Sequence, residues 1–434
     1  MEPFTVHTSC LFDPERKEFL PNRSLTVDPT TGLITEVYHR QNDTDKLKPS
    51  DIDLRHLPVV LPGLIDAHTH VFLHPYSETS STVQMRDESP VERIVRATNH
   101  VRRALLAGFT TYRDLGTESL GDSDAGLRDT INRGLIPGPR MYVATEALAS
   151  SGGYEIRNEN PKLNLPRASD VADGVDGVRA AVRRRIGAGA DIIKVYADYR
   201  RRTMRFPAPI TPCCDIQFPP KDARDIVPTE ARNPNVLMYS QEEMDAIVAE
   251  ANRANCPVAA HCGDNEAVKM AALAGVTSIE HGFMADEEIL KILKLHGCIF
   301  VPTLAVIDLF VKDEKKMQAI LKTIKRAWEM GVQLATGGDT GTFPHGENAK
   351  ELELMIKAGI PLEEVLYAAT IGGWKACGGV RCGRLFGWWE EGCAADIVGL
   401  VEDPRESKGA LRAVDFVMKD GKVWKMDGSA VGMV

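Results

Sequence analysis

Six residues that can bind metal ions or transfer protons recur at one kind of place in the sequence. They are His68, His70, Lys194, His261, His281 and Asp339. Each lies at or just beyond the end of a short apolar run that is typical of a buried strand. Imidazole and carboxylate groups bind divalent cations such as zinc, and the carboxyl ends of barrel strands meet at one mouth. The pattern therefore predicts a shared metal site.

The segment LIDAHTHVF contains the closest pair of these residues. Because side chains alternate along a strand, His68 and His70 point to the same side and can enter one metal sphere. Three further runs, PVAAHCGD, TSIEHGFM and LATGGDTG, end in His261, His281 and Asp339. A single histidine in an apolar strand is more often a hydrogen-bonded core residue, but five metal-type residues at strand ends favour one common site.

Lys194, in DIIKVYA, allows two interpretations. A protonated ammonium has three donors and no lone pair, so it cannot bind a metal. The first interpretation is a strand-end lysine whose charged head lies in water, because lysine is rarely buried. The second is carboxylation of the amine by CO₂ to a carbamate, which removes the cation and creates a carboxylate between two divalent ions. The surrounding ligand-type residues favour the second.

Between about residues 62 and 375, apolar runs alternate with amphipathic helical stretches, which is typical of a parallel α/β fold. The eight runs are 64–70, 110–115, 140–144, 191–197, 257–262, 277–281, 299–304 and 333–338. Helices are expected at 92–107, 175–187 and 241–255, the last with a capping box at Ser240 and Glu243. Eight strand–helix units over roughly 310 residues favour a (β/α)8 TIM barrel, which is a fold of the α/β class. A doubly wound sheet is the alternative, but its glycine-rich nucleotide motif is missing.

Both ends of the chain have the pattern of β-structure. The start has two alternating runs around a turn at 28–32, and the end has a hairpin signal at Asp420 and Gly421. Neither end is long enough for a stable sheet alone. We therefore expect a composite β-sandwich domain from residues 1–61 and 376–434, with the metal-binding barrel at 62–375. The proline-rich region 199–239 is expected to be a loop on the active-site face.

The composition limits the class of partner. The 434 residues carry a formal charge of −9 and are 43% hydrophobic, which is ordinary for a globular protein and gives no support for nucleic-acid or membrane binding. The start lacks the pattern of a secretory signal, and no apolar run is long enough to span a bilayer, so a cytoplasmic location is expected. The nine cysteines have no metal-binding spacing and are expected to be reduced thiols.

The motifs LPGLIDAHTH, GFTTYRDLG, DIIKVYA, VAAHCGD, SIEHG, ATGGDTG and AADIVGLVEDP resemble those of the amidohydrolase superfamily of metal-dependent hydrolases. Their combination is similar to the subgroup that contains Xaa-Pro dipeptidases, imidazolonepropionase-like proteins and fungal ochratoxin-hydrolysing amidases. The resemblance implies a binuclear metal centre. One metal would be bound by His68, His70 and Asp339, and the other by His261 and His281. Carboxylated Lys194 would bridge the two metals. Zinc suits these ligands, and manganese or cobalt are alternatives.

The resemblance also implies a reaction. Two cations lower the pKa of a water between them, and one of them polarises the scissile carbonyl. Asp339 would take the proton and pass it to the leaving amine, while Lys194 serves as the bridge. The expected substrate is the amide of a small molecule, such as a dipeptide, an N-acyl amino acid or a lactam. A lyase or decarboxylase on the same barrel and a catalytically silent scaffold are alternatives, but the complete ligand set favours hydrolysis.

Four further residues are candidates for substrate contact. Many relatives have GGHG after the third strand, whereas this chain has SSGGYEIRN with Tyr154 at that place. Tyr154 could donate a hydrogen bond to an oxyanion or to a substrate carboxylate, or it could pack. Tyr196 and His345 lie close to metal motifs, and His345 could either contact substrate or hold its loop in place by a hydrogen bond. Arg201 belongs to an arginine run that could bind a carboxylate or be solvated. A homo-oligomer is expected because many relatives form one.

Overall fold

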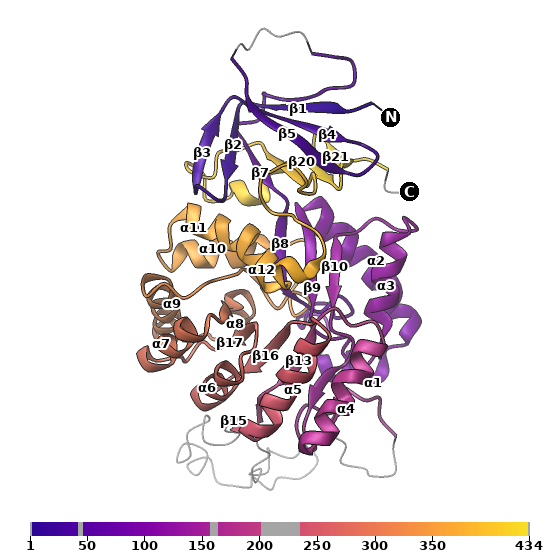
Figure 1. Cartoon of the computed structure of the whole chain (residues 1–434), viewed down its shortest axis with the longest axis vertical. Helices are drawn as coiled ribbons and strands as arrows, with labels where there is room; N and C mark the ends of the chain where they lie inside the picture. Colours follow the sequence, from indigo (N-terminus) through magenta and orange to yellow (C-terminus); the bar gives the residue numbers. More distant parts are fainter. Residues whose placement is uncertain (1, 42–46, 157–163, 201–234, 433–434) are drawn as a thin grey trace, which may run out of the picture.

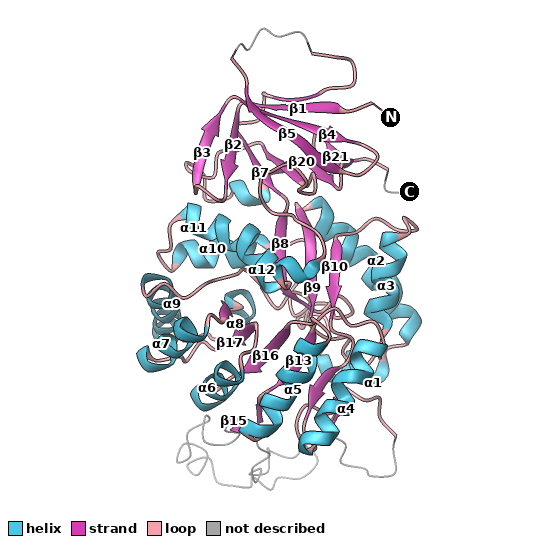
Figure 2. Cartoon of the chain, in the orientation of Figure 1, coloured by secondary structure: helices cyan, strands magenta, loops and turns pink. Residues whose placement is uncertain are grey.

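The computed structural model describes residues 2–41, 47–156, 164–200 and 235–432. Figure 1 shows strands from both chain ends together at one end of the molecule, with a larger α/β part beside them. In that larger part, helices surround the parallel strands (Figure 2). Across the described ranges, no helix is long and apolar enough to cross a membrane.

Strands from both chain ends share one sheet. Its order is β22-β21-β20-β19-β7-β2-β3, and a second sheet has the order β5-β4-β1-β6. Strand bounds are β1 Phe4–Thr8, β2 Cys10–Asp13, β3 Glu18–Pro21, β4 Arg23–Asp28, β5 Leu33–His39, β6 Ile52–Leu54, β7 Val59–Pro62, β19 Ile397–Leu400, β20 Val414–Lys419, β21 Lys422–Met426 and β22 Ser429–Ala430. The hairpin at Asp420 and Gly421 and the turn at 28–32 are therefore confirmed. The face-to-face sandwich stays a prediction.

The parallel strands form two sheets, in the orders β10-β9-β8 and β12-β11-β13-β16-β17-β18. Their bounds are β8 Leu64–Thr69, β9 Phe109–Asp114, β10 Arg140–Val143, β11 Ala147–Ala149, β12 Ser169–Val171, β13 Ile193–Tyr196, β16 Val258–Cys262, β17 Ser278–His281 and β18 Ile299–Val301. Seven of the eight predicted runs become strands. Within the described residues they do not form the single closed ladder that we expected from the sequence.

The eighth run, 333–338, is not a regular strand. It lies between β18 and β8, where the Phe300 amide donates to the Gln333 carbonyl (2.8 Å) and the His70 amide donates to the Thr340 carbonyl (2.7 Å). Regular pairing is interrupted because Gly337 and Gly338 carry no side chain to pack and Asp339 has φ +60°. Asp339 therefore has a backbone conformation outside the β region.

The predicted helices are confirmed with small shifts of their ends. Ser240 and Glu243 form the expected capping box at the start of α5. The helices are α1 Ser81–Asp87, α2 Pro90–Leu106, α3 Ser123–Asn132, α4 Gly174–Gly187, α5 Gln241–Arg253, α6 Asn265–Ala274, α7 Glu287–His296, α8 Leu304–Phe310, α9 Glu314–Glu329, α10 Ala349–Lys357, α11 Leu362–Tyr367 and α12 Gly373–Ala376. Of the expected loop 199–239, β14 Asp198–Arg200 and β15 Asn235–Leu237 pair antiparallel, and 201–234 lies outside the described residues.

Glu351 of α10 gives the fold a pH dependence. Its Oε2 accepts from the Ala305 amide (2.7 Å), while its buried Oε1 has no partner among the described residues. Burial raises its pKa to about 8 from 4.5, so the folded chain keeps a proton that the unfolded chain releases. Stability from this group is present below pH 4.5 and is lost as the pH rises toward 8.

Glutamine is neutral at every pH. We therefore expect the melting temperature of Glu351→Gln to lie at least about 2 °C above that of the wild type at pH 8.5, and to equal it near pH 4.5. Thermal melts followed by circular dichroism would measure this difference. Glu288→Gln, at an exposed position on α7, is the matched control. Parallel pH profiles for the wild type and Glu351→Gln would contradict the explanation.

Candidate active site

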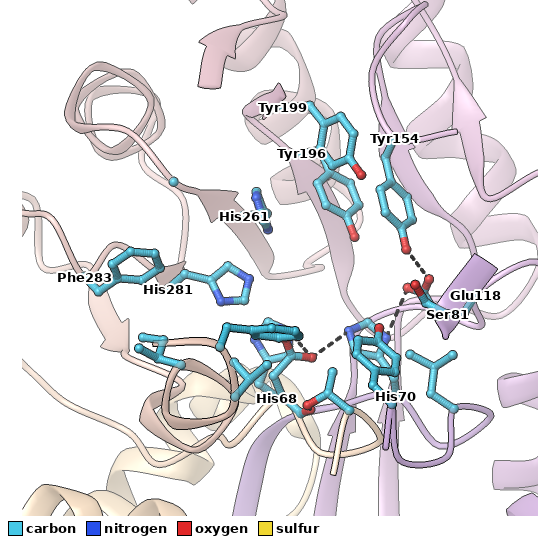
Figure 3. A pocket seen from close by; sticks show the side chains of 18 of the residues that line it. His68, His70, Ser81, Glu118, Tyr154, Tyr196, Tyr199, His261, His281 and Phe283 are labelled. Atoms are coloured by element: carbon cyan, nitrogen blue, oxygen red, sulfur yellow. Dashed lines mark hydrogen bonds and ion pairs between the residues drawn. The ribbon is translucent and has the colours of Figure 1, made fainter. Parts of the chain in front are cut away.

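All six residues singled out in the sequence line one cavity of about 750 Å³. His68, His261 and His281 belong to β8, β16 and β17, and Lys194 belongs to β13. His70 directly follows β8, and Asp339 directly follows the 333–338 segment. Figure 3 shows the histidine side chains directed toward the same space. The carboxyl ends of strands distant in sequence thus position these groups together.

His68, His70 and Asp339 form a group of possible metal ligands, with one ligand atom of each within 4.8 Å of the others. Asp339 Oδ1 lies 3.7 Å from His68 Nε2 and 3.4 Å from His70 Nε2. A Cβ at Gly337 would come within 2.8 Å of the His68 backbone nitrogen, so a glycine is needed for this close approach. The predicted spacing of His68 and His70 therefore places both beside the aspartate.

His281 connects this group to the other predicted ligands. Its ring centre lies 5.0 Å from that of His68 and 4.6 Å from that of His261. Lys194 is only 1% exposed, and burial lowers the pKa of its amine. A lowered pKa increases the fraction of neutral amine, which is the form that can react with CO₂. All three residues line the same cavity as the first group.

The donor chemistry of the histidines fits a metal. His68 Nδ1 lies 2.8 Å from Glu280 Oε2, His70 Nδ1 lies 3.0 Å from the Gly116 carbonyl oxygen, and His281 Nδ1 lies 2.8 Å from Thr303 Oγ1. The acceptors at His68 and His70 Nδ1 fix the tautomer and leave the Nε2 lone pair for a cation, whereas the Thr303 hydroxyl can donate to or accept from His281. Burial and the Lys194 charge hold the pKa of His68 well below its usual value, which favours the neutral imidazole that binds a cation.

Sequence reasoning missed the charged network behind His68. Arg113 of β9 donates to Glu280 Oε1 (2.7 Å), and Ser278 Oγ lies 2.5 Å from the same oxygen. Asp66 accepts from the backbone amides of His68 (3.1 Å) and Gly338 (3.3 Å), which joins the two ligand-bearing segments. The available signal was a charged residue inside an apolar strand, because such a residue needs a buried partner.

Tyr154 and Tyr196 both line the cavity, as expected. Their rings stack with centres 4.3 Å apart, and Tyr199 meets the Tyr154 ring at 79°. The Tyr154 hydroxyl donates to Glu118 (Figure 3), another cavity residue that sequence reasoning missed. Glu118 follows β9, and its place beyond a strand end was the signal that could have found it.

His345 and Arg201 have different outcomes. His345 does not line the main cavity; it stacks on His100 at 4.3 Å and faces a separate cavity of about 250 Å³. Its Nε2 lies 3.2 Å from the Leu73 carbonyl oxygen, so it holds the segment after β8 rather than reaching the metal-type residues. Arg201 lies outside the described residues.

The main cavity also has an apolar side. Its residues come from α8, the segment after it and the segment after β17: Phe283, Val306, Ile307, Phe310 and Val311. Phe310 is 63% exposed, which is unusual for a phenylalanine. Asp308, the only charged residue of α8, pairs instead with Lys350 (2.8 Å). Mixed apolar and polar lining is typical of a small-molecule site.

The fold and the cavity define an α/β protein with a candidate metal site at the carboxyl ends of its parallel strands. Residues 59–212 and 216–424 match the Amidohydrolase family, and the chain belongs to that family. The ochratoxinase of Aspergillus niger is 30% identical over 459 residues, which cover 98% of this chain and 87% of the relative.

Solved structures agree with this assignment. The crystal structure of A. niger ochratoxinase has a TM-score of 0.77 and 28% identity, covering 100% of this chain and 99% of that chain. A Xaa-Pro dipeptidase with methionine bound in its active site has a TM-score of 0.77 and 27% identity, covering 98% and 100%. The chain is thus a hydrolase that acts on C–N bonds, with the α/β architecture of the TIM-barrel amidohydrolases.

Proposed function

We propose that this protein hydrolyses the amide bond of a small molecule at a binuclear metal centre, with zinc as the preferred metal. The observation that carries the proposal is the convergence of strand-end imidazoles, an aspartate and a buried lysine on one cavity. His68, His70 and Asp339 would hold one cation. The substrate class is a dipeptide, an N-acyl amino acid or a lactam, supported by the names of the ochratoxinase and dipeptidase relatives.

The second cation would be held by His261 and His281, with carboxylated Lys194 between the two. When bound, the cations would activate a water molecule and polarise the scissile carbonyl. Asp339 is the proton acceptor and donor of the reaction, because its carboxylate lines the cavity beside the His68 and His70 imidazoles that would hold the cation. Its proton goes to the leaving nitrogen as the C–N bond breaks.

The apolar side of the cavity and its aromatic side flank this group of residues. They would bind the two parts of the substrate and orient the scissile carbonyl over Asp339. A decarboxylase on the same barrel has no use for two cations that activate water, so the complete set of ligand-type residues favours hydrolysis.

Removal of the lysine amine tests the binuclear centre. We expect about two bound zinc ions per wild-type chain after reconstitution with bicarbonate, and one or none in Lys194→Ala, measured by elemental analysis. Labelled ¹³C-bicarbonate is expected to give a carbamate NMR signal in the wild type that Lys194→Ala lacks. Lys291→Ala, at an exposed position on α7, is the matched control. Unchanged metal content in Lys194→Ala, or wild-type protein without metal, would overturn the proposal.

A further inference from the structure

Glu118 and Tyr154 form a pair on the cavity wall that the proposed reaction does not use. Glu118 is only 4% exposed, and its Oε1 lies 3.3 Å from His70 Nδ1. The Tyr154 hydroxyl donates its hydrogen to Oε2 of the same carboxylate. Glu118 and Ser119 both have positive φ, at 52° and 76°. Such backbone conformations cost free energy for residues other than glycine and are found most often at functional sites.

A count of hydrogens defines what this pair can offer a ligand. A phenol has one hydrogen, and Tyr154 donates it to Glu118. The phenolic oxygen therefore keeps only lone pairs for the cavity, and an ionised carboxylate is likewise an acceptor only. Tyr154 could not also donate to an oxyanion, which was one of the roles considered from the sequence. We call Glu118 and Tyr154 the acceptor pair.

The surroundings keep the acceptor pair in this arrangement. The Tyr154 ring stacks on Tyr196 with an interplanar angle of 15°, and Ser169 Oγ donates to the Tyr154 carbonyl oxygen (2.6 Å). Behind Glu118 lies Arg93, which is 1% exposed and donates to the Thr117 carbonyl oxygen (3.3 Å). Burial lowers the pKa of the Arg93 guanidinium, and the negative charge of Glu118 opposes that shift.

We propose that the acceptor pair binds an N–H group of the substrate, so that the enzyme selects secondary amides over tertiary amides. This inference rests on the proposed function and narrows its substrate class. A secondary amide donates its N–H hydrogen to the Tyr154 oxygen, which its own hydrogen bond to Glu118 holds in place. A tertiary amide has no such hydrogen and cannot form this hydrogen bond, which weakens binding and lowers the rate.

A matched substrate pair tests the selection. We would compare kcat/KM for N-benzoyl-alanine and N-benzoyl-N-methylalanine, which differ in the N–H hydrogen and the methyl group that replaces it. For the wild type we expect kcat/KM at least about tenfold higher for the N–H substrate. Tyr154→Phe keeps the ring and removes the acceptor oxygen, so this ratio is expected to fall severalfold toward one. A purely steric effect of the methyl group would persist in Tyr154→Phe.

The matched control is Tyr76→Phe, a tyrosine that lines the same cavity but is not bonded to Glu118. Its ratio is expected to stay at the wild-type value. Equal hydrolysis of both substrates by the wild type would overturn the inference while the proposed function stands. An unchanged ratio in Tyr154→Phe would also overturn it. If the zinc-loaded enzyme hydrolyses no member of a panel of dipeptides, N-acyl amino acids and lactams, the proposed function itself fails.

Discussion

Asp339→Asn is expected to lower kcat/KM by about 1000-fold or more. The substitution keeps the size of the side chain but removes its negative charge and its ability to accept a proton. Proton transfer by a positioned carboxyl group contributes roughly 100- to 10,000-fold to such reactions. Asp339 Oδ1 also lies within 3.7 Å of the Nε2 atoms of His68 and His70, so the loss of charge weakens the metal site as well.

Steady-state kinetics at saturating zinc, together with metal content per chain, would separate these two effects. Asp308→Asn is the matched control, because Asp308 belongs to α8 but pairs with Lys350 and does not line the cavity. We expect it to keep wild-type activity. A kcat/KM for Asp339→Asn within tenfold of the wild type, at full metal content, would show that Asp339 does not transfer the proton.

The strand-end residues could be predicted because each stands in its own local motif. His68 of β8 and His70 just after it show their spacing within one short motif, and apolar runs locate the other strand ends without any knowledge of the tertiary structure. The eighth run failed as a strand for a physical reason. Its apolar start at Leu334 has the right pattern, but two glycines and the positive φ of Asp339 break the pairing that periodicity alone predicts.

The partners of the supporting residues could not be predicted from local motifs. Glu118 acquires its position from Tyr154, which lies 36 residues away, and Glu280 acquires its position from Arg113, which lies 167 residues away. No local pattern specifies such pairs. His345 had two interpretations from the sequence, substrate contact or a hydrogen bond that holds its loop. The structure places it against His100 and the Leu73 carbonyl oxygen, outside the lining of the main cavity. Sequence proximity to a motif therefore does not establish contact with its site.

Variants of the buried pair Arg113 and Glu280 are expected to affect the stability of the fold and the affinity for zinc differently. Both side chains are 0% exposed, and Arg113 Nη2 lies 2.7 Å from Glu280 Oε1. Arg113→Met leaves the Glu280 charge buried without its partner, so we expect the free energy of unfolding to fall by about 3–5 kcal/mol. Chemical denaturation would measure the change. Arg128→Met, which breaks a partly exposed pair with Asp191, is the control and should cost about 1 kcal/mol or less.

The double variant Arg113→Met/Glu280→Gln removes both buried charges, and we expect it to be more stable than Arg113→Met alone. Its zinc affinity should nevertheless stay about 10- to 100-fold below that of the wild type, because the Glu280 carboxylate that orients His68 Nδ1 at 2.8 Å is gone. Zinc titration against a competing chelator would measure this affinity. A double variant no more stable than Arg113→Met would contradict the buried-charge explanation, and wild-type zinc affinity would show that Glu280 does not orient the ligand. The two readouts thus distinguish a residue that stabilises the fold from one that also positions the metal site.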